Sequence, residues 1–387
     1  MTYAKYHDEL RAHFGSRLRY VYLHRDPRDV ALSFRNAVVG DSHIYCIMKA
    51  WREIQDECIK IIRSEPNIIH VVTYEQLLAD QRLYVKLLFD FFGFPFPEED
   101  VMHSHESREA VAAAKQSSLW ANLTKADDNF KRNQLCKWLH PDTGLKNDEI
   151  LLVESLVHDV MVVQKYPFHV INADRPPVQY TAAEIAEFER LNKEGNSQKK
   201  TQLQAEDPAD FARRMHQEEV LTWMDQPPAA PIVCSEMQNI SSNGLQLPQP
   251  HTLPPVFFMV GSQRSGSNWL RVMLNQSAHI AAPHPPHILK QFKPILVKYG
   301  DLQCEDNFLR LLDHVCTFVE RNPVPWVDKN ENPILFDRTE VRQRCSTLCQ
   351  QTESKKNTLV CIFHALMDIY TEVSHALYWL HIPCPPH

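Results

Sequence analysis

Short runs of apolar residues alternate along this chain with longer segments in which apolar residues recur every three or four positions. The run at 256–260, VFFMV, is continuously apolar, as is typical of a parallel strand that is covered on both faces. Strand-length runs that alternate with helical segments predict an α/β fold with a parallel sheet. We expect strands at 18–24, 68–73 and 256–261, and helices at 27–37, 43–64, 75–91, 107–116, 148–163, 267–276, 287–298, 304–321, 340–350 and 356–376.

The segment 256–275, VFFMVGSQRSGSNWLRVMLN, predicts a strand, a glycine-bounded loop and a helix. Gly261 and Gly266 have the G-x-x-x-x-G spacing of a phosphate-binding loop, whose backbone N–H groups and following helix N-terminus attract anions. Ser267 and Asn268 stand where an ATP-binding loop has Lys and then Ser or Thr, which argues against a magnesium-dependent kinase. Arg264 instead offers a planar guanidinium suited to phosphate or sulfate. Together these features predict a P-loop-like three-layer sandwich, with a central parallel sheet and helices on both faces.

A second strand–turn–helix unit lies at 19–36, RYVYLHRDPRDVALSFRN, and has no glycine. Asp26 is a good N-cap, Pro27 fits the first helical position, and Asp29 favours the helix dipole at the third. Arg25 therefore falls at the carboxyl end of the strand, where open α/β sheets bind ligands. An arginine in this position is also common as a surface residue or an ion-pair partner.

Taken together, the lysine-free glycine loop and the R-D-P-R-D-V-A-L-S-F segment resemble the sulfotransferase superfamily, which uses 3′-phosphoadenosine-5′-phosphosulfate (PAPS) as donor. Segments such as PHPPHILKQF and NPVPW are similar to the microbial-type branch of that superfamily. The resemblance implies that the glycine loop, including Gly261, Arg264, Ser265, Gly266, Ser267 and Asn268, holds the 5′-phosphosulfate. It further implies that Arg25 and Ser33 hold the 3′-phosphate, that Trp269 and Tyr74 lie at the adenine, and that Lys131 and Arg132 close over the 3′-phosphate.

The two halves of the resemblance occur in inverted order, because the superfamily places the glycine loop before the R-D-P-R-D-V segment. Residues 1–171 resemble the C-terminal half of the domain, and 253–387 resemble a truncated N-terminal half. Residues 172–252 form a Pro- and Gln-rich linker in which we expect two short helices, at 182–192 and 207–215. Three accounts stay open: a circular permutant in one chain, a slice of a tandem array, or a homodimer that exchanges halves.

The candidate catalytic residues are Arg264, His284 and His287. Sulfuryl transfer needs stabilisation of charge on the donor, which Arg264 can supply, and a base for a hydroxyl or amine acceptor, which suits a histidine. Near its end the chain has HALYWLHIPCPPH, without the lysine of the W-V-x-K-S strand found in the superfamily, so we expect that strand to be missing. His381 in this segment does not match a family motif as a whole.

Composition adds constraints on partners and location. A net charge of −7 argues against nonspecific binding to nucleic acid or to an anionic membrane, and no run of 18 apolar residues occurs. The ten cysteines lack a framework spacing, which suggests free thiols, and no metal site is expected. These points predict a cytoplasmic enzyme that acts on a small molecule. The rival hypothesis is a catalytically impaired remnant or a tandem-array fragment that only binds the nucleotide.

Overall fold

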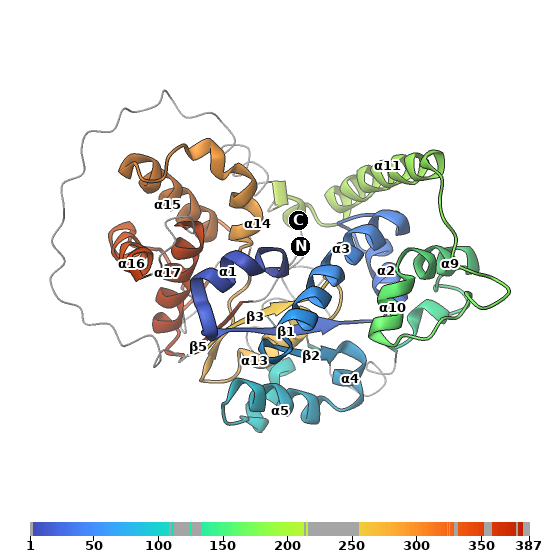
Figure 1. The fold of residues 1–387 in the computed structure, drawn as a ribbon, viewed down its shortest axis with the longest axis horizontal. Helices are drawn as coiled ribbons and strands as arrows, with labels where there is room; N and C mark the ends of the chain where they lie inside the picture. Colours follow the sequence, from blue (N-terminus) through green and yellow to red (C-terminus); the bar gives the residue numbers. More distant parts are fainter. Residues whose placement is uncertain are drawn as a thin grey trace.

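The computed structural model describes residues 3–107, 110–111, 124–125, 133–212, 214–215, 255–322, 324, 326–328, 332–351, 358–376 and 378–381. Its centre is a five-stranded sheet with the order β2-β1-β3-β5-β4 (Figure 1). The strands are β1 Leu18–His24, β2 Ile69–Thr73, β3 Val256–Val260, β4 Ile280–Ala281 and β5 Tyr378–His381. Neighbouring strands are parallel, and β1 pairs with β3 from Leu18 opposite Val256 to Tyr22 opposite Val260. The sheet is therefore built from both ends of the chain.

Side chains that alternate along β1 and β3 face two different hydrophobic cores. Tyr20, Tyr22 and Phe258 belong to one core, and Val21 and Phe257 belong to the other. The first core includes residues of α1 His7–Phe14, α3 Ile44–Ser64, α14 Ile288–Phe292, α15 Glu305–Glu320, α16 Arg338–Gln351 and α17 Thr358–Val373. The second includes residues of α4 Tyr74–Ala79, α5 Gln81–Phe92, α6 Glu98–Met102 and α13 Ser267–Leu274. Helices thus cover both faces of a parallel sheet, as the sequence predicts (Figure 1).

A third hydrophobic cluster joins α2 Pro27–Arg35 and the middle of α3 to α9 Asn147–Leu156 and α10 His158–Gln164. Helix α11 Ala182–Glu206 packs on the outer side of this cluster, against α3 (Figure 1). The remaining short elements are 3₁₀ turns at Tyr3–Tyr6, Gly15–Arg17, Pro66–Ile68, Ser104–Glu106, Lys137–Leu139 and Lys293–Tyr299.

The three strands predicted from the sequence are present, but three predicted helices are divided. The segment 287–298 forms α14, which ends at Phe292, and the 3₁₀ turn Lys293–Tyr299. The segment 75–91 forms α4 and α5, because Thr73 begins the first with a capping box and Asp80 caps the second. The segment 148–163 is divided into α9 and α10 at Val157. Most of the predicted helix 107–116 lies outside the described residues.

Two expectations are corrected. The expected helix 182–192 extends to Glu206, so α11 has 25 residues and is no short helix in a linker. A strand is also present where the sequence suggested a missing one. β5 pairs in parallel with β3 through Leu380 opposite Phe257 and His381 opposite Phe258. The four residues of this strand, YWLH, include two aromatic residues that favour extended structure and no lysine.

Among the described helices, none is both long enough and apolar enough to cross a membrane. Seven described cysteines carry free thiols, but Cys304 is disulfide-bonded, so the expectation of free thiols throughout is wrong.

Candidate anion-binding site

The glycine loop between β3 and α13 packs directly against residues of the N-terminal part of the chain. Gly261 has a φ of +142°, and a Cβ atom at this position would collide with the backbone carbonyl of Leu23 on β1. Gly266 has a φ of +89°, and a Cβ atom there would collide with the ring of Tyr74. Both glycines are needed because the loop lies against the end of β1 and the start of α4 without space for a side chain.

Inside the loop, the hydroxyl groups of Ser262 and Ser265 lie 2.7 Å apart, and both residues are buried. This hydrogen bond between the two side chains links the two ends of the S-Q-R-S turn. Arg264 has a φ of +64°, in the left-handed region. Its Nε donates a hydrogen bond to Oγ of Ser33, at 3.0 Å. Arg264 and Ser33 are therefore neighbours, as expected of two groups that share a ligand.

Arg25 follows β1 directly and is buried beside the glycine loop. Its Nη1 donates to the backbone carbonyl of Arg264 at 3.3 Å, and its Nη2 donates to the carbonyl of Gln134 at 2.7 Å. The guanidinium carbon lies 4.4 Å from the centre of the Tyr74 ring, and a carboxylate oxygen of Asp29 lies 3.6 Å from Nη2. The Nε of Arg25 is buried without a hydrogen-bond partner among the described residues. An orphan donor on a buried cation is a fitting partner for an anionic ligand.

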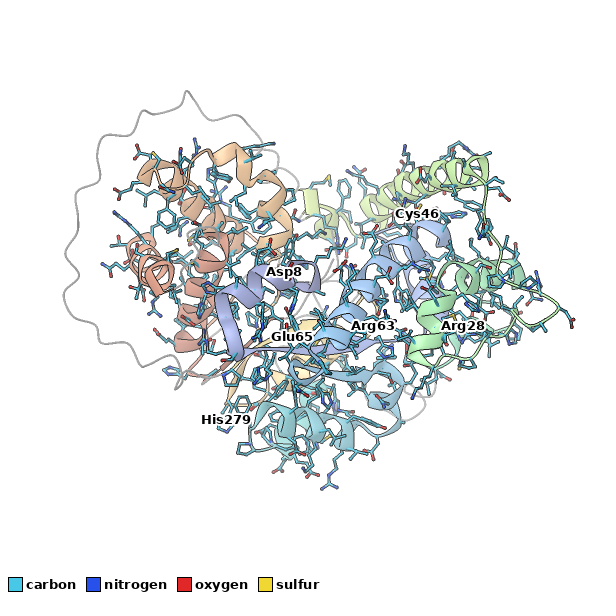
Figure 2. The ribbon with its side chains drawn as sticks, viewed as in Figure 1. Asp8, Arg28, Cys46, Arg63, Glu65 and His279 are labelled. Atoms are coloured by element: carbon cyan, nitrogen blue, oxygen red, sulfur yellow. The ribbon has the colours of Figure 1, made fainter. Side chains whose placement is uncertain are left out.

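A second buried arginine fixes the turn that carries Arg25. Asp26 caps α2 by accepting from the backbone N–H of Arg28, and its carboxylate also pairs with the Arg28 guanidinium at 2.7 Å. Arg28, labelled in Figure 2, bridges to Glu154 of α9 at 2.9 Å and stacks 3.9 Å from the Trp138 ring. This network anchors the start of α2 to α9, so Arg25 is presented from a rigid turn.

Two lysines that the sequence did not single out for the anion site lie close to these arginines. Burial lowers the pKa of Lys137, and the positive charges of Arg25 and Arg264 lower it further. Burial also lowers the pKa of Lys199, to about 8, against the raising effect of Asp41 and with a further lowering by Arg264. Both lysines thus lie within the electrostatic influence of Arg264, and such a group of cations would stabilise an anion bound beside the loop. The basic pair at 199–200 in the sequence is the signal that could have indicated Lys199.

The aromatic residues expected at the adenine also meet. The rings of Tyr74 and Trp269 lie 6.0 Å apart with an interplanar angle of 74°, an edge-to-face arrangement. Trp269 and Asn268 belong to the first turn of α13, whose N-cap, Gly266, makes no side-chain capping bond. The N-terminus of α13 therefore begins directly at the glycine loop.

The candidate bases are placed differently. His284 and His287 follow β4, and β5 separates β4 from β3 in the sheet. β4 itself lies two strand spacings, or ~10 Å, from β3, which carries the glycine loop at the same edge of the sheet. Both are buried, and the backbone carbonyl of His284 accepts from Nε1 of Trp326 at 2.6 Å. The remaining predicted residues, Lys131 and Arg132, lie outside the part of the chain that the structure describes.

The fold and site together define an α/β protein with a candidate anion-binding site at the carboxyl edge of a parallel sheet. The sequence model of the Sulfotransferase family matches residues 2–98, which supports a sulfotransferase domain. The match includes Arg25, Ser33 and Tyr74 and ends before the glycine loop, which the tertiary structure brings to the same residues. No curated protein and no solved structure was found to match the chain.

Proposed function

We propose that the protein transfers a sulfuryl group from PAPS to a hydroxyl or amine acceptor, at a site formed by the N-terminal part and the C-terminal part together. The observation that carries the proposal is the contact of Arg25 and Ser33, inside the family match, with Arg264 of the glycine loop outside it. A donor with two separate anionic ends explains why two arginines from distant segments meet at one place.

In this proposal the backbone N–H groups of the glycine loop and the N-terminus of α13 bind the 5′-phosphosulfate. Arg25 and Ser33 bind the 3′-phosphate, and the orphan Nε of Arg25 supports this assignment. Tyr74 and Trp269 contact the adenine ring through their aromatic faces. In this proposal the segment with Arg25 precedes the glycine loop in the chain, which is the reverse of their order in the superfamily. The two segments are brought together by the pairing of β1 with β3.

The reaction is an in-line displacement. The acceptor oxygen or nitrogen forms a bond to sulfur while the bond between sulfur and the bridging oxygen of the donor breaks. The electron pair leaves with adenosine 3′,5′-bisphosphate, and the acceptor proton passes to a base. Arg264 stabilises the charge that develops on the leaving group. We propose His284 or His287 as the base, because they are histidines at the same edge of the sheet as the loop.

The second candidate function is nucleotide binding without transfer. It is favoured by the sequence of β5, which has no lysine, and by the burial of His284 and His287 away from solvent. Such a protein would bind the nucleotide at the anion site but would not transfer a sulfuryl group.

Titration with adenosine 3′,5′-bisphosphate, followed by transfer from sulfur-labelled PAPS to a panel of alcohols, phenols and amines, tests the proposal. We expect binding in the submicromolar range, its loss in both Arg25→Ala and Arg264→Ala, and label in the acceptor. Binding without transfer would support the second candidate. A preference for ATP with magnesium would overturn both.

A further inference from the structure

A cluster of three thiols and two imidazoles, which the proposed transfer does not use, lies between α1, α16 and α17 (Figure 1). The Sγ atoms of Cys345 and Cys349 on α16 lie 4.0 Å apart. The thiol of Cys361 on α17 is within side-chain hydrogen-bonding range of both. Cys345 and Cys361 are buried, whereas Cys349 is half-buried. This thiol cluster is separate from the anion site, because His13 precedes the amino end of β1 and the glycine loop follows the carboxyl end of β3.

A chain of hydrogen-bonding groups leads from Cys361 towards the surface. Sγ of Cys361 lies 3.9 Å from Nδ1 of His13, and Nε2 of His13 lies 2.9 Å from Nδ1 of His364. Nε2 of His364 faces a carboxylate oxygen of Asp368 at 3.5 Å, and the Asp368 side chain is partly exposed. Because an ionised carboxylate can only accept, it favours a proton on Nε2 of His364 and leaves Nδ1 as an acceptor. By the same logic Nδ1 of His13 is free to accept the proton of the Cys361 thiol.

Burial keeps both imidazoles neutral, as such a relay requires. It lowers the pKa of His13 to about 4, and the positive charge of Arg17 lowers this pKa further. It also lowers the pKa of His364 well below its usual value. A neutral imidazole can accept a proton on one nitrogen and donate from the other, whereas an imidazolium can only donate. The pair can therefore carry a proton away from Cys361.

Cys349 is the thiol that is best placed to react first. Hydrogen bonds with the thiols of Cys345 and Cys361 lower the pKa of Cys349, against the raising effect of burial. The same contacts, together with burial, raise the pKa of Cys345, which therefore stays protonated as a donor. A thiolate with access to solvent is the form of cysteine that peroxides oxidise.

The partner of Cys349 in a disulfide follows from the helix geometry. Cys345 and Cys349 lie one turn apart on the same helix, where Cβ atoms are about 5–6 Å apart. A disulfide needs Cβ atoms about 3.5–4.5 Å apart, so this pair cannot be bridged without distortion of α16. Cys361 belongs to the neighbouring helix and contacts Cys349, so it is the thiol that can close a disulfide.

We propose that the thiol cluster is a peroxide-reactive site, in which Cys349 is oxidised and Cys361 then forms a disulfide with it. In the first step, Sγ of Cys349 attacks hydrogen peroxide, so that an S–O bond forms, the O–O bond breaks and hydroxide leaves. In the second step, Sγ of Cys361 attacks the sulfur of this sulfenic acid while its proton passes to His13. The S–S bond forms, the S–O bond breaks, and the departing hydroxide takes up a proton as water. Two thiols are thereby oxidised to one disulfide, and the peroxide is reduced to two water molecules.

Peptide mapping by tandem mass spectrometry, after equimolar hydrogen peroxide is added to the full chain, tests the site. We expect a disulfide between Cys349 and Cys361. Cys136 is the internal comparison, because it is exposed but its pKa is raised by partial burial and by the carboxylates of Asp29 and Asp26. Cys349 should be oxidised at least about tenfold faster than Cys136, since only the thiolate reacts. Faster oxidation of Cys136 would overturn the proposal.

Variants separate the two steps. Cys349→Ser should abolish the disulfide, whereas Cys361→Ser should leave a sulfenic acid at Cys349 that dimedone traps. His13→Gln should slow disulfide closure by at least about tenfold, as is usual for loss of a general base, and change sulfenic acid formation by less than about twofold. Cys46→Ser is the matched control, because Cys46 is half-buried and burial raises its pKa to about 11. An equal effect of His13→Gln on both steps would overturn the role of the relay.

The unchanged chain provides a test that does not depend on the folding of these variants. In urea the thiols of Cys349 and Cys136 should be oxidised at equal rates, and equal rates in the folded chain as well would overturn the proposal. A stoichiometric zinc ion in the purified protein, with oxidation only after chelation, would make the cluster a metal site and would also overturn it. Sulfuryl transfer is measured independently, so failure of either proposal leaves the other in place.

Discussion

Arg25 and Arg264 are 239 positions apart in the chain, yet Nη1 of Arg25 donates a hydrogen bond to the backbone carbonyl of Arg264 at 3.3 Å. The contact follows from the parallel pairing of β1 with β3, which brings the ends of both strands to one edge of the sheet. Ser33 then completes a three-residue group through its bond with Nε of Arg264. Arg25, Ser33 and the backbone and side chain of Arg264 thus lie side by side at this edge of the sheet.

The two arginines should act as a unit in nucleotide binding. Arg25→Ala and Arg264→Ala should each weaken binding of adenosine 3′,5′-bisphosphate by about 10- to 100-fold, because hydrogen bonds to charged groups contribute about 1.5–3 kcal/mol. The double variant should lose less than the sum of the two single effects, since the residues are in contact. Fluorescence or calorimetric titration measures all three. Arg63→Ala is the control, because Arg63 is exposed at the end of α3 (Figure 2). Fully additive losses would argue against one shared ligand.

Gly261→Ala should lower the free energy of unfolding by more than the cost of placing alanine at a positive φ. The new Cβ would meet the carbonyl of Leu23, and backbone strain of this kind costs about 1–3 kcal/mol before any clash is counted. Gly93→Ala is a matched control, because Gly93 has a φ of +79° and open space around its Cβ position. Urea unfolding of both variants measures the difference. Equal losses would mean that the close approach of the loop to β1 does not contribute to stability.

Stability should fall as the pH decreases from about 6.5 towards 4, in part through His24. Burial lowers the pKa of His24 to about 4, whereas an unfolded histidine titrates near 6.5. Between these values the unfolded chain binds the proton and the folded chain does not, so the free energy of unfolding rises with pH across this window. The full effect is about 3 kcal/mol for a shift of this size. Burial acts in the same direction on His13, whose pKa is also lowered to about 4.

His24→Gln should reduce this dependence while keeping a polar group near the hydroxyl of Tyr166, which lies 3.1 Å from Nδ1 of His24. Urea unfolding at a series of pH values measures the slope, and the NMR titration of the imidazole gives the pKa. A His24 pKa near 6.5 in the folded protein would contradict the prediction.

The two parts of the chain should stay together after the connection between them is cut. A protease site introduced within 216–254 would separate the β1 part from the β3 part without touching their paired strands. The hydrophobic core shared by Tyr20, Phe258 and Phe363 should hold the pieces in one complex. Size-exclusion chromatography with light scattering measures the mass before and after cleavage. Separation of the pieces at micromolar concentration would contradict a joint domain.

The same measurement distinguishes the arrangements that the sequence left open. A mass of 45 kDa for the uncut chain is expected if the parts pair within one chain. Twice this mass for the uncut chain would support a homodimer that exchanges halves. In that case each complex left after cutting would contain an N-terminal piece from one chain and a C-terminal piece from another.

A base at the edge of the sheet should affect turnover and not nucleotide binding. His284→Gln or His287→Gln should lower kcat for sulfuryl transfer by about 10²- to 10⁴-fold, as is usual for loss of a general base. Affinity for adenosine 3′,5′-bisphosphate should change by less than about twofold. Steady-state kinetics with labelled donor, together with titration, give both values. If neither variant alters kcat, the base lies elsewhere.

Local sequence signals predicted the strands and helix starts well, because each depends on neighbouring residues. Asp26 and Pro27 define the start of α2, and the apolar run at 256–260 defines β3. The same signals failed for β5, whose four residues form a strand through pairing with β3 and β4 rather than through a long apolar run. They also failed for the length of α11, which is fixed to Ser42 and Phe34 by tertiary contacts.

In the candidate site, too, some residues could be predicted from local sequence and others could not. Gly261, Gly266 and Arg264 could be selected from spacing and residue chemistry, since the loop is a local motif. Lys137 has no such local motif, and the basic pair that contains Lys199 does not say which segment it packs against; only tertiary packing brings both lysines under the influence of Arg264.

The sequence by itself determined the two anion-binding motifs and the strand-and-helix units that carry them, because caps, glycine spacing and apolar runs act over a few residues. The tertiary structure alone decided that the two motifs lie in contact and that α11 lines a cavity beside the glycine loop. The physical reason is that parallel pairing of β1 with β3 buries the apolar faces of both strands in common cores. This pairing joins residues such as Arg25 and Arg264, whose separation in sequence carries no information about their distance in space.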